Sequence, residues 1–238
     1  MEPVKEVCVE SFQEAVRAVE AGATRIELCE NLSCGGTTPS YGTIKKTIEK
    51  LHVPVMVMIR PRGGDFCYTK EEFEIMCDDL RMCNLLGASG AVFGLLMPSG
   101  RIDIRRTSEL VNLSHRMPIT FHKAIDDCTD LVQAVDFLKQ IGISRILTSG
   151  GQPTAMEGSE MLRKMIQIAG EELKIIVAGK VTWENFEEIK QIAQDALEDG
   201  LLLEVSEAQM REALHQLIDQ LINPYPKQKA AIEKSYTN

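Results

Sequence analysis

Short apolar segments alternate with longer amphipathic segments along the chain. The apolar segments have the length of strands, are rich in Val, Ile and Leu, and begin at Val4, Thr24, Pro54, Gly90, Pro118, Ser144, Lys174 and Gly200. Such runs are typical of parallel strands that are covered on both faces. The intervening segments have a helical period. Between residues 70 and 87 the apolar side chains share one face, namely Phe73, Met76, Leu80 and Cys83.

Local signals mark the ends of the predicted helices. Capping-box pairs predict four helix starts, at Ser11 with Glu14, Thr69 with Glu72, Thr154 with Glu157, and Ser206 with Gln209. Glycines that stand just before strands predict four helix ends, at Gly22, Gly87, Gly142 and Gly200.

Eight strands, each followed by a helix, predict a single-domain α/β protein with the (β/α)8 TIM-like barrel fold. An open, doubly wound sheet is the alternative, and the lack of a G-x-G-x-x-G sequence after the first strand disfavours it. We expect the barrel domain to span residues 1–222. The polar segment 223–238 is then a C-terminal extension or an oligomer contact.

Composition narrows the functional classes. The net charge of −9 disfavours binding to nucleic acid or to an anionic membrane. No apolar run approaches the roughly 20 residues that span a bilayer, and the first ten residues lack the pattern of a signal peptide. The seven cysteines include no C-x-x-C pair, so we expect free thiols and a cytoplasmic protein.

Side chains alternate between the two faces of a strand, which predicts the residues that point into the barrel. Placing Val, Ile and Leu toward the helices leaves an inward polar set of Glu6, Cys8, Glu27, Cys29, Thr120, His122, Glu204 and Ser206, with Arg60 in phase with Met56 and Met58. Isolated charges there cost several kcal/mol each unless they are paired. This set predicts a polar pocket at the carboxyl ends of the strands, or an internal salt-bridge network between the glutamates and Arg60 that only fills the barrel.

Residues 59–68, IRPRGGDFCY, form a predicted loop on the face where TIM barrels carry their active sites. Arg60 and Arg62 suit the clamping of a carboxylate or phosphate, and Asp65 suits the orientation of an arginine. Alternatively, the loop is rigid and its arginines pair with rim acids. Two further loops, residues 34–40 and 147–151, contain Gly, Ser and Thr, including Thr148 and Ser149. They suit either anion binding or plain turns.

Proton transfer and metal binding have separate candidates. Glu27 and His122 are candidates for moving a proton, and His122 suits either a general base, a metal ligand or a satisfied core residue. Cys8 and Cys29 lie at matching heights on neighbouring predicted strands. Two thiolates suit Cu(I), while small buried fillers are the plainer interpretation.

Six strings in one order, VCVES, RIELC, GGTTPS, MIRPRGGDFCY, TFHKAID and RILTSGG, resemble the CutC copper-homeostasis family from about residue 4 to residue 180. The resemblance implies a TIM-like barrel, a cytoplasmic location, and a homodimer or larger homo-oligomer. It implies Cu(I) ligands at Cys8 and Cys29. It also implies pocket positions at Glu6, Glu27, Arg60, Arg62, Asp65, His122, Thr148 and Ser149.

The chain departs from the family pattern at several positions. Lys123 and Ile125 stand where the family usually has arginine and phenylalanine, Lys180 interrupts a glycine-rich turn, and Ser206 replaces a histidine. The role of this altered C-terminal quarter stays open.

Three functional hypotheses follow. The first is a copper-homeostasis protein that binds Cu(I) through Cys8 and Cys29. The second is an enzyme for a small anionic metabolite, with Arg60 and Arg62 binding the anion and Glu27 or His122 moving a proton. The third is a structural or interaction role without chemistry.

Overall fold

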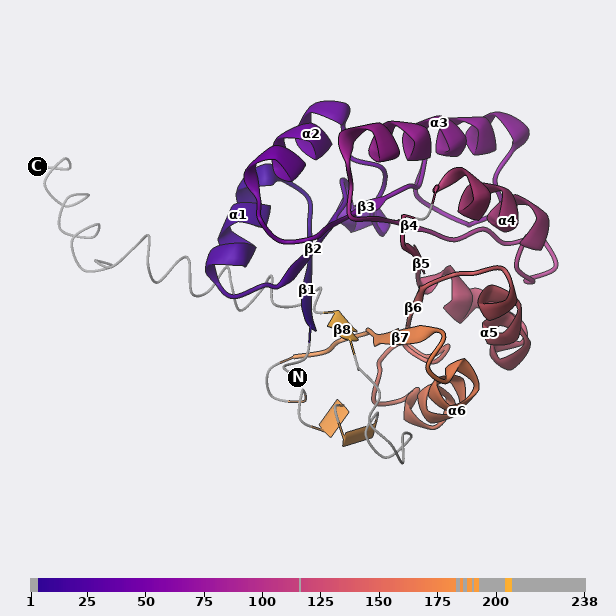
Figure 1. Cartoon of the computed structure of the whole chain (residues 1–238). Helices are drawn as coiled ribbons and strands as arrows, with labels where there is room; N and C mark the ends of the chain where they lie inside the picture. The colour runs from indigo at the N-terminus through magenta and orange to yellow at the C-terminus, as the bar shows by residue number, and fades with distance from the viewer. Residues whose placement is uncertain are drawn as a thin grey trace, which may run out of the picture.

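The computed structural model describes residues 4–115, 117–182, 185, 188–189, 191–192 and 204–206, and for residues 204–206 it describes the backbone alone. Eight parallel strands close into a barrel, and β8 pairs with β1 (Figure 1). The strands are β1 Val4–Val9, β2 Arg25–Leu28, β3 Val55–Met58, β4 Gly90–Phe93, β5 Ile119–Phe121, β6 Arg145–Thr148, β7 Lys174–Val177 and β8 Glu204–Ser206. The predicted barrel fold is confirmed, and the open sheet was the wrong alternative.

Helices surround the ring of strands on its outside (Figure 1). The α-helices of the described residues are α1 Phe12–Glu20, α2 Tyr41–Lys50, α3 Lys70–Leu86, α4 Ile104–Leu113, α5 Leu131–Gln140 and α6 Ser159–Ala169. Two short 3₁₀ helices, η1 Leu32–Cys34 and η2 Lys123–Asp127, lie in the loops after β2 and β5. None of the helices in the described ranges is long and apolar enough to cross a membrane.

Most of the predicted helix boundaries are confirmed. Ser11 caps α1, and Thr69 and Glu72 form a complete capping box at α3. The start predicted at Thr154 was wrong, because the Thr154–Glu157 pair caps a separate turn and α6 begins at Ser159.

Only glycine fits at position 158, because a Cβ there would lie 1.8 Å from the carbonyl oxygen of Ser149. The predicted helix end at Gly200, the Ser206–Gln209 cap and the 223–238 extension lie outside the described residues.

Two layers of side chains confirm the predicted alternation. Val7 and Ile26 pack in the large cluster between barrel and helices. A second cluster inside the barrel contains Cys8, Cys29, Met56, Met58 and Val92. Cys8 and Cys29 of the predicted inward set therefore face the barrel interior, as the period of two requires.

The interior ion pair differs from the expected one. Glu6 pairs with Arg25, its neighbour in the β1–β2 register, and both side chains are buried. On the other side of the barrel the Arg145 Nε donates to the Thr120 hydroxyl at 3.1 Å. The expected partner, Arg60, lies beyond the end of β3 and bonds to loops instead.

Candidate functional site

A cavity of about 430 Å³ opens at the carboxyl ends of the strands. Side chains of β1, β2, β3 and β6 line it, together with the loops that follow β2, β3, β5 and β7. Four predicted site residues line this cavity: Cys8, Glu27, Cys29 and His122. The structure therefore brings together the predicted thiols and the predicted proton-transfer groups.

Two thiols and one carboxyl form a compact buried cluster in the cavity. The Sγ atoms of Cys8 and Cys29 are 3.5 Å apart, and the Glu27 Oε1 lies 3.8 Å from the first and 3.6 Å from the second. This cluster arises because Cys8 and Glu27 are partners in the β1–β2 register and Cys29 follows two residues later. Its three ligand atoms are close enough to hold one metal ion.

The thiols are held in their protonated form. The hydrogen bond with Cys29 lowers the pKa of Cys8, but burial and the charges of Glu27 and Glu6 outweigh it and raise that pKa. The pKa of Cys29 is raised well above its usual value by its hydrogen bond with Cys8 and by burial. A metal ion that binds here must therefore displace protons.

Glu27 is a buried carboxyl that is neutral at physiological pH. Burial, followed by the charge of Glu6, raises its pKa to about 8. The thiols donate to its Oε1, while its Oε2 has no hydrogen-bond partner among the described residues. This oxygen is oriented for a ligand or water rather than for a protein group.

His122 lines the cavity and carries a buried hydrogen-bond donor. Its Nδ1 accepts the backbone N–H of Ala124 at 3.1 Å, which assigns the proton of the neutral ring to Nε2. Burial and the charge of Arg60 lower the pKa of His122 to about 3. The Nε2 atom has no partner in the described part of the chain. In this state the imidazole is a donor at Nε2, and its expected role in moving a proton stays a prediction.

Arg60 holds loops together at the edge of the cavity. Its guanidinium donates to the carbonyl oxygens of Cys34 at 3.0 Å, Gly36 at 2.8 Å and Gly64 at 2.7 Å. It also lies 4.9 Å from the centre of the Phe66 ring. These contacts use the two terminal nitrogens of the guanidinium, while its buried Nε has no partner among the described residues. The binding of an anion by Arg60 stays a prediction.

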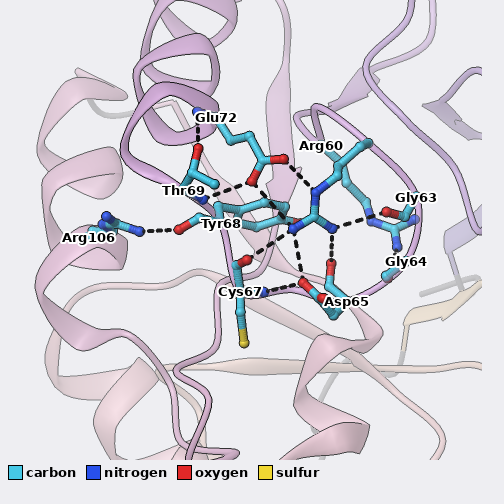
Figure 2. Close-up of polar contacts among 10 residues, drawn as sticks. Arg60, Gly63, Gly64, Asp65, Cys67, Tyr68, Thr69, Glu72 and Arg106 are labelled. Atoms are coloured by element: carbon cyan, nitrogen blue, oxygen red, sulfur yellow. Dashed lines mark hydrogen bonds and ion pairs between the residues drawn. The ribbon is translucent and has the colours of Figure 1, made fainter.

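Arg62 and Asp65 belong to the same loop, and Figure 2 shows Asp65 next to Cys67 of that loop. The Arg62 Nε contacts the Glu72 carboxylate at 2.5 Å, and its Nη2 contacts Asp65 at 3.0 Å. Asp65 also accepts the backbone N–H of Cys67. This is the expected alternative of a rigid loop whose arginines pair with rim acids. Neither residue lines the cavity, and their binding of an anion stays a prediction.

Thr148 and Ser149 surround an acid of the protein itself. Asp126 accepts the hydroxyl of Thr148 at 2.5 Å and the backbone N–H groups of Ser149 and Gly151. Asp126 also contacts the Lys123 ammonium at 2.6 Å. The anion-binding donors predicted in residues 147–151 therefore already bind a carboxylate, and an external ligand for them stays a prediction.

Sequence reasoning missed three residues that shape this region, namely Arg25, Phe66 and Asp126, and it left the role of Lys180 open. Phe66 and Lys180 line the cavity, and Lys180 has a left-handed backbone with φ of 52°. Arg25 could have been found from the sequence, because it lies two residues before Glu27 and therefore points to the same face of the strand. The side chains of Glu204 and Ser206 lie outside the described residues.

Comparisons with known proteins agree with this geometry. The model of the CutC family matches residues 4–196. The human copper homeostasis protein cutC homolog is 42% identical over 184 residues, which cover 77% of this chain and 67% of that protein. A CutC family protein of Edwardsiella ictaluri is 48% identical over 174 residues, or 73% of this chain and 69% of that protein.

Solved structures extend the comparison. The putative copper homeostasis protein CutC from Streptococcus agalactiae has a TM-score of 0.79 and 32% identity, covering 86% of this chain and 98% of that one. A phosphonopyruvate hydrolase in complex with oxalate and Mg²⁺ has a TM-score of 0.64 at 12% identity, covering 93% of this chain and 82% of that one. The second likeness concerns the fold alone.

Proposed function

The chain belongs to the CutC family, and from this premise we propose that it is a copper-homeostasis protein that binds Cu(I) through Cys8 and Cys29. The observation that carries the proposal is the buried thiol pair, 3.5 Å between sulfurs, beside the Glu27 carboxyl. Soft thiolate ligands favour Cu(I) over hard cations.

The donor set fits a small metal ion. Two collinear metal–sulfur bonds of about 2.3 Å would separate the sulfurs by about 4.6 Å, which is more than the separation in the structure. A bent arrangement with Glu27 as a third ligand therefore requires less movement of the strands. The thiols line the cavity but are little exposed to solvent, because Cys8 is 7% exposed and Cys29 is fully buried.

The test compares two double variants by competition with a Cu(I) chelator. Cys8→Ser with Cys29→Ser removes the proposed ligands. Cys77→Ser with Cys83→Ser removes two other buried thiols, on α3, and is the matched control. We expect the first variant to lose about 100-fold or more in affinity and the control to bind like the wild type. Equal Cu(I) stoichiometry and affinity in all three proteins would end the proposal.

A cytoplasmic location and a homo-oligomeric state belong to the same proposal. All seven cysteines are free thiols, which suits a reducing compartment. Fractionation of the source cells tests the location, and light scattering of the full chain tests the oligomer. Recovery outside the cytoplasm or a monomeric mass would contradict the corresponding part.

A further inference from the structure

The cavity is larger than a metal ion requires. Its volume of about 430 Å³ falls in the range of pockets that hold small organic ligands, and one water molecule occupies only about 30 Å³ in the liquid. The thiol cluster takes up one part of it. Apolar side chains line much of the remainder, including Leu32, Phe66 and Leu147.

His122 lines this space, and its ring is held rigidly. Ala124 fixes its Nδ1, and the Phe66 ring centre lies 5.0 Å from its own. A Cβ on Gly94 would come within 2.5 Å of the imidazole, so only glycine leaves room for it. The side chain is 4% exposed, and its Nε2–H is unsatisfied among the described residues. A buried donor of this kind calls for an acceptor from a ligand.

Two lysines add positive charge to the cavity lining. The ammonium of Lys123 is balanced by Asp126 at 2.6 Å. Lys180 forms no ion pair within the described part of the chain, and its backbone carbonyl accepts the side chain of Asn185 at 2.8 Å. The lining thus combines a neutral donor, an uncompensated cation and an apolar wall.

The remaining donors distinguish between classes of anion. Phosphate sites are typically built from several backbone N–H groups or an arginine fork. Here the N–H groups of Ser149 and Gly151 bind Asp126, and the Arg60 fork binds backbone carbonyls. A carboxylate needs fewer donors, and its apolar body suits the wall formed by Phe66 and Leu147.

We propose that the cavity binds a small organic carboxylate, with His122 Nε2–H and Lys180 contacting its oxygens and Phe66 packing against its body. The site uses residues other than the copper ligands. The proposed donors also differ from Arg60 and Arg62, the two residues that the sequence predicts as anion ligands.

The test uses benzoate and pyruvate as probes, with benzyl alcohol as the neutral counterpart of benzoate and inorganic phosphate as the competing anion. Calorimetric titration of the metal-free full chain should show saturable binding of at least one of the two carboxylates. It should show none for benzyl alcohol or phosphate. Absence of binding by both carboxylates, or binding of phosphate alone, would overturn the proposal.

Variants then locate the site. We expect Lys180→Met and His122→Phe each to weaken carboxylate binding by about 10-fold or more, as the loss of a charged or buried hydrogen bond does. His122→Gln retains a donor and should recover part of the affinity. Lys164→Met, on the exposed face of α6, is the control. Unchanged affinity in Lys180→Met and in correctly folded His122 variants would place binding elsewhere and refute the assignment.

The Cys8→Ser, Cys29→Ser variant separates this proposal from the copper proposal. It should lose Cu(I) binding and keep carboxylate binding. Loss of carboxylate binding in this variant, with its fold intact by circular dichroism, would show that the two sites are one and would contradict the inference.

Discussion

Individual residues in the cavity owe their chemistry to burial. Glu27 and His122 both hold their neutral forms, because burial is the first cause of the raised pKa of one and the lowered pKa of the other. Glu6 instead forms a buried ion pair with Arg25. The described barrel interior therefore contains a neutral acid, a neutral imidazole and an ion pair.

Glu27 should make the stability of the fold fall as the pH rises. The pKa of Glu27 in the folded protein, about 8, exceeds its usual value of 4.5. The stabilising contribution of Glu27 is therefore complete below pH 4.5 and is lost as the pH rises through about 8. Glu27→Gln cannot ionise and should be more stable than wild type near pH 9, by on the order of 3 kcal/mol.

Urea unfolding of the metal-free proteins at several pH values measures this difference. Glu49→Gln, at an exposed position of α2, is the control and should follow the wild type. If wild type and Glu27→Gln show parallel pH profiles, the carboxyl does not titrate as stated.

The Glu6–Arg25 pair should show the asymmetry of buried ion pairs. Arg25→Met leaves a buried carboxylate without its partner arginine, which typically costs about 3–5 kcal/mol of unfolding free energy. Glu6→Gln combined with Arg25→Met should cost much less. Urea unfolding of the two variants tests this. Lys45→Met, in an exposed pair with Glu49, should cost under about 1 kcal/mol. Equal losses in the single and double variants would contradict the pairing.

At the scale of elements, the site depends on loops that the strands alone do not position. The loop containing η1 and the loop after β3 supply Leu32, Gly35 and Phe66 to the cavity. Arg60 connects these loops through three carbonyl oxygens, so it acts as a positioning residue. Arg62, by contrast, ties the second loop to α3 through Glu72 (Figure 2).

Arg60→Met should loosen both loops. Removing the guanidinium leaves the carbonyls of Cys34, Gly36 and Gly64 without this donor, at a cost of about 3 kcal/mol. Amide hydrogen exchange should speed up in residues 31–38 and 61–67 together. Arg62→Met should affect only the second range. Arg60→Lys should not restore protection, because an ammonium lacks the planar fork. Unchanged exchange in residues 31–38 would remove Arg60 from this role.

At the scale of the whole molecule, the cavity exists because the sheet is closed. Each strand pairs with the next, and β1 pairs with β8, so the strands form a closed ring (Figure 1). Inward positions from distant parts of the chain therefore share one axis. The proposed copper ligands lie on β1 and just after β2. A metal ion bound by both would connect two neighbouring strands of the barrel.

Cu(I) should therefore stabilise the entire fold against heat. At a free concentration of about 100 times the dissociation constant, a ligand specific to the native state adds about 2.7 kcal/mol. For a chain of this size that corresponds to several degrees in Tm. Calorimetric scans under reducing, anaerobic conditions measure the shift, and excess chelator should reverse it. A shift of the same size in Cys8→Ser with Cys29→Ser would point to metal bound elsewhere.

Sequence alone determined the features that depend on local period. The strand number, the inward phase of Glu6, Cys8, Glu27 and Cys29, and the glycine ends of α1, α3 and α5 follow from alternation and from backbone conformations that can be recognised in short segments.

Only the tertiary structure decided which polar groups meet. Glu6 found Arg25 through strand register, Arg60 found loop carbonyls, and Asp126 filled the loop of residues 147–151. The partners in the pairs Glu6–Arg25, Arg60–Gly36 and Asp126–Gly151 are 19, 24 and 25 residues apart. A pattern of residue types does not specify the paths of the chain that bring them into contact. The physical reason is that hydrogen bonds and ion pairs act over a few ångströms, whereas sequence patterns fix only the direction in which a side chain leaves its own strand.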